Sequence, residues 1–128
     1  MPKVIIDILE GRSEEHKKAL LDAVHHALVE ALKIPDDDRI QILNEHKRTH
    51  FELPPDKSEL YTSIEIKMFA GRSLVAKRTL YRSLATNLNK LGIEPHDFMV
   101  ILHEPAMENW GIRGLPASEI NIGFKIDV

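Results

Sequence analysis

The amino-acid sequence predicts an α+β fold, in which two strand–helix–strand repeats form a four-stranded sheet with both helices on one face. The run LEGRS at residues 9–13 returns about sixty residues later as FAGRS at residues 69–73. Each copy follows an apolar run of period two and precedes a helical pattern of apolar residues. After each helix, a second apolar run ends in glutamate, at Glu45 and at Glu104.

The first repeat covers about residues 2–51 and opens with a strand, because β-branched residues alternate along residues 4–9. Ser13 stands at the position of a helix N-cap, where its hydroxyl can accept a hydrogen bond from an amide of the first turn. A helix of about five turns follows, since its apolar residues keep i, i+3, i+4 spacing. Pro35 marks the end of that helix.

The second repeat covers about residues 61–116 and has the same order of elements. Ile64, Ile66 and Met68 alternate along its first strand, Ser73 is the expected helix cap, and Gly92 is the expected helix stop. Residues 1–128 are therefore expected to form a single domain.

Two further segments lie outside the repeats. Residues 52–60 are rich in turn-forming residues and are expected to connect the repeats. Residues 119–128 alternate isoleucine or phenylalanine with polar residues or glycine, which predicts a final strand.

The arrangement of the strands follows from the handedness of the connections. Right-handed crossovers make the two strands of each repeat parallel and place both helices on the same face of the sheet. Ile5 and Leu9 point to the other face, which is expected to be apolar and covered by other subunits.

Composition excludes several classes of function. The absence of cysteine excludes disulfides, thiol nucleophiles and thiolate metal sites. The formal net charge of -3 makes nucleic acid an unfavourable partner. No run approaches the ~20 apolar residues of a membrane span, and no secretory signal is recognisable, so no membrane association and a cytoplasmic location are expected. Adjacent His25 and His26 point in different directions on a helix, and no metal site is expected.

Pro2 is the residue that points most directly to chemistry. Removal of the initiator methionine before a small residue would leave a secondary amine at the start of a strand. A free α-amino group titrates at about 7.7–8.0, and burial and nearby arginines would favour its neutral form. Pro2 is therefore a candidate general base.

The opening from Pro2 to Ser13, including LEGRS, resembles 4-oxalocrotonate tautomerase, and the segment 109–114 resembles the region that lines the active site in that family. The doubled length is similar to the malonate semialdehyde decarboxylase group of the tautomerase superfamily. This resemblance implies the tautomerase and macrophage migration inhibitory factor fold, a homotrimer of double units, and a small carboxylate as substrate. It also implies catalysis without a cofactor.

The resemblance implies roles for residues in both repeats. Arg72 is expected to hold the substrate carboxylate, because a guanidinium at a strand-to-helix turn can make a two-pronged contact. Asp38 aligns with an aspartate that decarboxylase relatives use beside the proline, and Trp110 is expected to line the pocket. Arg12 occupies the place of Arg72 in the first repeat, where it could bind substrate but is expected to face an inactive second pocket.

Two positions depart from the family pattern. Ala70 replaces the first of two arginines that the decarboxylases carry in this turn. Ile40 stands where single-unit tautomerases have an arginine, and Arg39 or Arg113 is expected to supply that charge.

The sequence therefore predicts a tautomerase that interconverts keto and enol forms of 2-oxo or 2-hydroxy-enoic acids, with Pro2 as the base, Arg72 as the carboxylate anchor and Asp38 beside them. Two alternatives stay open. The first is a decarboxylase or hydratase that uses protonated Pro2 and Asp38. The second is a non-enzymatic trimeric binding protein, which retention of Met1 would support.

Overall fold

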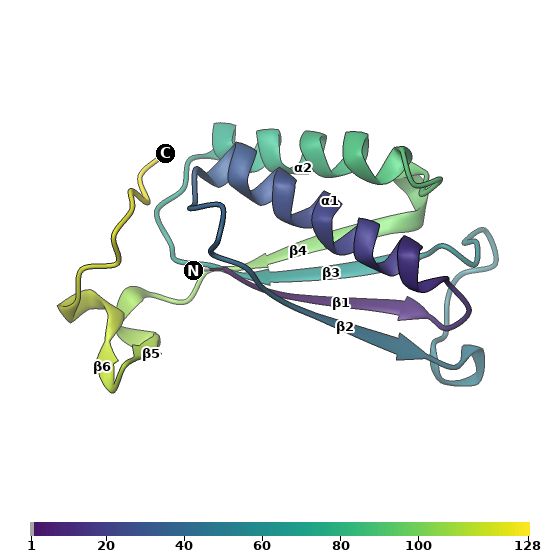
Figure 1. Ribbon diagram of the computed structural model, residues 1–128, viewed down its shortest axis with the longest axis horizontal. Helices are drawn as coiled ribbons and strands as arrows, with labels where there is room; N and C mark the ends of the chain where they lie inside the picture. Colours follow the sequence, from purple (N-terminus) through teal and green to yellow (C-terminus); the bar gives the residue numbers. More distant parts are fainter. Residues whose placement is uncertain (1) are drawn as a thin grey trace.

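The computed structural model describes residues 2–128, which form a four-stranded sheet with two long helices on one face (Figure 1). The strand order is β2-β1-β3-β4, with parallel pairs within each repeat and an antiparallel pair, β1 and β3, at the centre. This confirms the predicted architecture of the repeats. The main elements are β1 (Lys3–Leu9), α1 (Glu14–Leu32), β2 (Ile40–His46), β3 (Thr62–Lys67), α2 (Leu74–Asn89) and β4 (Phe98–His103).

Both long helices begin at the predicted caps. Ser13 Oγ accepts a hydrogen bond from His16 N at 3.1 Å, and Ser73 Oγ accepts one from Ala76 N at 3.1 Å. The helix α1 ends at Lys33, whose φ of 57° takes the chain into the left-handed region and stops the helix.

The core lies between the sheet and the helices. Val4, Ile6 and Ile8 of β1 and Ile64 and Ile66 of β3 point toward the helices and are at most 1% exposed. Their partners come from the apolar stripes of both helices, as the spacing predicts. These partners are Leu20, Val24, Leu28, Leu80, Leu84 and Leu88.

The other face of the sheet is mixed, not uniformly apolar as expected. Exposed apolar residues lie on its two outer strands, whereas the central strands carry charged residues there. Leu9, which was expected on this face, is only 2% exposed and lines a cavity with Phe51 and Pro54. The correction arises because residues after β2 fold back over Leu9. The exposed apolar residues are Ile40, Ile42, Met99 and Ile101.

The strand predicted at residues 119–128 is absent from the described part of the chain. A short hairpin of β5 (Gly111–Ile112) and β6 (Leu115–Pro116) and a 3-10 turn at Ala117–Glu119 lead into an irregular segment beside the start of α2 (Figure 1). Ser73 N donates to Val128 O at 3.0 Å. The alternation of apolar and polar residues predicted an extended chain. It could not show that this segment forms no hydrogen-bonded pair with the edge of a sheet.

The remaining connections are 3-10 turns, at Arg48–His50, Pro95–Asp97 and Met107–Asn109. Among the described residues, no helix combines the length and the apolar character that crossing a membrane requires.

Candidate active site

Pro2 is buried where β1 begins. Its neighbour Lys3 pairs with Lys67 of β3 on one side and with Ile40 of β2 on the other. The start of β1 therefore meets the end of β3 and the start of β2 at one end of the sheet. Consequently the loop before β2 and the turn after β3 both lie beside Pro2.

Arg72 lies in that turn and is only 6% exposed. Its Nη1 donates to Phe69 O at 3.2 Å, whereas Nε and Nη2 are buried without a hydrogen-bond partner among residues 2–128. Burial lowers the pKa of Arg72, and the carboxylates of Glu104 and Asp38 oppose that shift. A buried guanidinium with unused donors gains most from a ligand that accepts both hydrogen bonds, such as a carboxylate.

Asp38 is half-buried, two residues before β2, and its amide donates to Pro35 O at 3.1 Å. Its charge acts on Arg72, and the register places the start of β2 beside the start of β1. The structure thus brings Pro2, Arg72 and Asp38 to the same end of the sheet.

Trp110 belongs to an aromatic cluster next to Arg72. Its ring packs edge-on against Phe69 at 4.8 Å between centroids, and its Nε1 donates to Pro105 O at 3.1 Å. Phe124 stacks on Phe69 at 6.4 Å, and the Arg72 Cζ lies 6.0 Å from the Phe124 ring centroid. The cluster gives the Arg72 end of the sheet an apolar flank.

The sequence reasoning missed three of these residues. Phe69 replaces Leu9 of the first motif, and this aromatic substitution was the available signal. Glu104 ends the second apolar run and accepts a hydrogen bond from Lys77 Nζ at 2.6 Å, which repeats the Lys17–Glu45 pair of the first repeat at 3.0 Å. For Phe124 no local signal exists, because only the tertiary fold places the tail there.

Arg39 and Arg113, the candidates for a second arginine, are both exposed, and only Arg113 borders the aromatic cluster. Arg39 Nη2 donates to Asp22 Oδ1 of α1 at 2.8 Å. Arg113 lies at the tip of the β5–β6 hairpin with a φ of 53°, and it lines a small cavity with Phe69 and Phe124.

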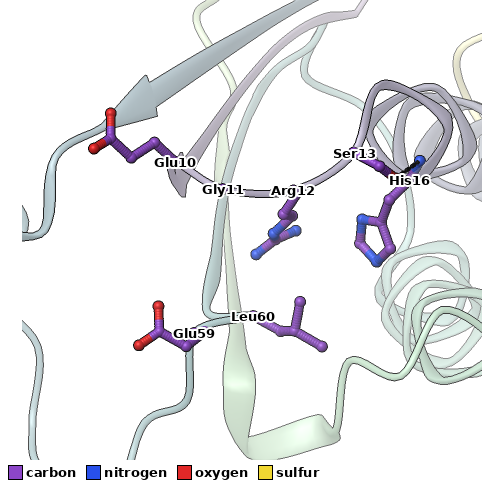
Figure 2. A pocket seen from close by; sticks show the side chains of 7 residues that line it. All are labelled: Glu10, Gly11, Arg12, Ser13, His16, Glu59 and Leu60. Atoms are coloured by element: carbon purple, nitrogen blue, oxygen red, sulfur yellow. Dashed lines mark hydrogen bonds between the residues drawn. The ribbon is translucent and has the colours of Figure 1, made fainter.

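Arg12 lies at the opposite end of the sheet, where β1 ends. Its Nη2 donates to Tyr61 O at 3.0 Å and to Thr62 Oγ1 at 3.1 Å. There it lines a pocket with His16 and Leu60 (Figure 2). Within residues 2–128, no group of three or more histidine, aspartate or glutamate side chains could hold a metal ion.

Comparison with known proteins finds similarity along most of the chain. Two family models, both described as tautomerase enzymes, match residues 2–57 and 38–113. The chain is 32% identical to the probable tautomerase YrdN of Bacillus subtilis, over 86% of this chain and 89% of that protein. It is 27% identical to the probable tautomerase YusQ of the same organism, over 86% and 91%.

Among solved structures, malonate semialdehyde decarboxylase inhibited by 3-bromopropiolate is similar in fold, with a TM-score of 0.78 and 31% identity. The match covers 84% of this chain and 86% of that one.

Proposed function

The chain belongs to the tautomerase superfamily, and we propose that it is a cofactor-independent keto–enol tautomerase of 2-oxo and 2-hydroxy-enoic acids. One observation carries the proposal. Arg72 is buried, two of its nitrogens have no hydrogen-bond partner among residues 2–128, and it lies at the end of the sheet where Pro2 precedes β1. This placement supports a carboxylate anchor near a potential amine base.

The proposed reaction needs only proton transfer. The substrate carboxylate accepts hydrogen bonds from Nε and Nη2 of Arg72, and its apolar part lies against Trp110 and Phe69. The Pro2 nitrogen takes the proton of the enol hydroxyl, and the oxygen electrons form the C=O bond. The electron pair of the C=C bond then takes a proton from the protonated amine, which forms the C–H bond and restores the neutral nitrogen. A positioned group of this kind contributes about 10²–10⁴-fold to the rate.

The base exists only if Met1 is removed, because the nitrogen of an internal proline is a non-basic amide. Met1 lies outside the described residues, so its removal is a premise of the proposal. Asp38 is proposed to orient the amine or a water molecule beside Arg72.

A second arginine is proposed to assist Arg72 with the charge of the enolate. Arg113 is the better candidate, because it already lines a cavity with Phe69 and Phe124. Arg39 would first have to leave its ion pair with Asp22.

We further propose that the chain assembles as a homotrimer through the sheet face opposite the helices. Four apolar residues on the outer strands of that face are 42–56% exposed in the single chain. Exposed apolar residues at the two edges of one sheet face are typical of subunit contacts. These residues are Ile40, Ile42, Met99 and Ile101.

The proposal is tested by intact mass and by phenylenolpyruvate ketonisation, measured on wild type and on Pro2→Ala with Met1 confirmed absent. We expect a mass that lacks Met1 and a kcat/KM that falls by about 10²-fold or more in the variant. Retained Met1, or activity indifferent to Pro2, would refute the amine mechanism and favour a non-enzymatic binding protein.

A decarboxylase or hydratase is the second candidate, favoured by the electrostatic interaction of Asp38 with Arg72 and by the 31% identity to malonate semialdehyde decarboxylase. In that case Pro2 would work in its protonated form. Titration of ¹⁵N-labelled Pro2 by NMR separates the two: the base requires a neutral nitrogen at pH 7, and the acid requires a charged one.

A further inference from the structure

The two repeats place equivalent arginines at opposite ends of the sheet. Because β1 and β3 are antiparallel, the end of β1 lies beside the start of β3, just as the end of β3 lies beside the start of β1. Arg12 therefore contacts Thr62 at the start of β3, and Arg72 lies in the equivalent position near Pro2, which precedes β1. Asp97 acts electrostatically on Arg12 as Asp38 acts on Arg72.

The pocket around Arg12 has a volume of about 350 Å³ and is lined by the turn before α1, by His16 and by the connector residues Glu59 and Leu60. Figure 2 shows the Arg12 side chain extending from its turn toward Leu60, with His16 at one side and the glutamates Glu10 and Glu59 at the other.

The guanidinium of Arg12 is only partly satisfied. Its Nε and Nη1 are buried and have no hydrogen-bond partner among residues 2–128, and the same holds for His16 Nδ1. The nearby carboxylates are engaged elsewhere, because Asp97 accepts hydrogen bonds from Ser58, and Glu59 is paired with Arg48. A buried cation with unused donors is stabilised by an anion that accepts them.

Burial lowers the pKa of Arg12 to about 10, and the field of Asp97 opposes the shift. Arg12 is thus still charged at neutral pH.

Thr62 distinguishes this pocket from the first one. Its backbone nitrogen is an amide inside the chain, and its hydroxyl donates to Leu60 O at 2.9 Å while it accepts from Arg12. Neither group is a base at neutral pH, so the position equivalent to Pro2 supplies no proton acceptor here.

We propose that the Arg12 pocket is a second carboxylate-binding site, which holds a small carboxylate without converting it. Glu59 favours a monocarboxylate over a dicarboxylate by repulsion, and Leu60 offers contact to an apolar group. The site does not depend on Pro2 being a catalyst, so its failure and the failure of the tautomerase proposal are separate results.

The test uses phenylglyoxylate, a 2-oxo monocarboxylate with no enolisable hydrogen, which cannot be turned over in either pocket. It is titrated into the full-length ¹⁵N-labelled wild type and followed by NMR. We expect saturable shifts of the amides of Gly11, Arg12 and His16, alongside those of the Arg72 turn. Shifts confined to the Arg72 turn, or none in the Arg12 turn at saturation, would overturn the proposal.

Variants give an independent readout by calorimetry, with circular dichroism as a check on folding. Arg12→Gln should weaken the affinity of the second site about ten-fold or more and lower the stoichiometry from two to one per chain. Glu59→Gln removes a negative charge that repels the ligand, so it should raise the affinity of the second site. If wild type and both variants bind phenylglyoxylate with the same affinity and stoichiometry, the proposed site is refuted. If Arg12→Gln does not fold, the NMR titration of the wild type alone tests the proposal.

Discussion

The two motif arginines occupy equivalent places in the sequence, yet their nitrogen atoms have different partners. Arg12 donates to a backbone carbonyl and a threonine hydroxyl, whereas Arg72 donates, among residues 2–128, only to Phe69 O. Arg72 therefore keeps more of its hydrogen-bonding capacity for a ligand. At the scale of single residues, this difference separates the proposed catalytic pocket from the proposed silent one.

Replacement of Arg72 tests the anchor directly. Arg72→Gln should lower kcat/KM for phenylenolpyruvate by about 10²–10³-fold, because a buried charged donor is lost where negative charge develops. Arg78→Gln removes an exposed arginine of α2 and serves as the control. The roles proposed here would be wrong if the two variants lost activity equally, as measured by steady-state kinetics.

The resemblance of the sequence to the tautomerase superfamily implied Pro2, Arg72 and Asp38 as one group, and the sheet register brings their three segments to one end. The sequence could not predict Phe124, because the tail reaches Arg72 only through the tertiary fold. The exposure of Leu9 was predicted wrongly for a similar reason. Alternation along a strand shows to which face a side chain points, but it does not show which other residues cover that face.

At the scale of elements, the repeated caps offer a matched pair of variants. Ser13→Ala and Ser73→Ala should each lower the free energy of unfolding by about 1 kcal/mol, because each cap accepts one amide hydrogen bond at 3.1 Å. Only Ser73→Ala should also raise KM, since its turn holds Arg72. Urea unfolding and kinetics on both variants check this, and a KM that rises equally in Ser13→Ala would contradict it.

The connector between the repeats is tied to the start of β4 by Ser58, which donates to Asp97 through its amide at 3.0 Å and its hydroxyl at 2.5 Å. Burial raises the pKa of Asp97, but these hydrogen bonds outweigh it and hold the pKa below its usual 3.8. A lowered carboxyl pKa contributes stability that is present above the usual value and is lost as the pH falls through the folded value.

Ser58→Ala should therefore cost about 2 kcal/mol of unfolding free energy at pH 7. The difference from wild type should shrink as the pH falls from 3.8 through the lower folded-state pKa of Asp97, below which the carboxyl is protonated in both proteins. Urea unfolding at both pH values measures it, with exposed Ser118→Ala as the control. If the difference in unfolding free energy between wild type and Ser58→Ala stays constant with pH, the hydrogen bond from the Ser58 hydroxyl to the Asp97 carboxylate is not its source.

At the scale of the whole molecule, the sheet has one face covered by helices and one that the chain leaves open. The sequence predicted this asymmetry from the handedness of the crossovers, but it did not predict that charged residues interrupt the open face along β1 and β3. Asp7 contacts His46 Nε2 at 2.7 Å and Glu65 contacts His103 Nε2 at 2.8 Å across neighbouring strands. The apolar contribution to assembly is therefore concentrated on β2 and β4.

Met99→Glu tests that assembly, because it places a carboxylate among the apolar residues of the open face. Met99 is 56% exposed, and Val75, which is 68% exposed on α2, is the matched control. Light scattering should find wild type and Val75→Glu as trimers, and Met99→Glu as a smaller species, since burying an unpaired charge costs several kcal/mol. A monomeric wild type, or a Met99→Glu trimer, would exclude this face as the interface. Because Pro2, Arg72 and Asp38 lie in one chain, the dissociated variant keeps all three, and its remaining activity measures what neighbouring subunits add.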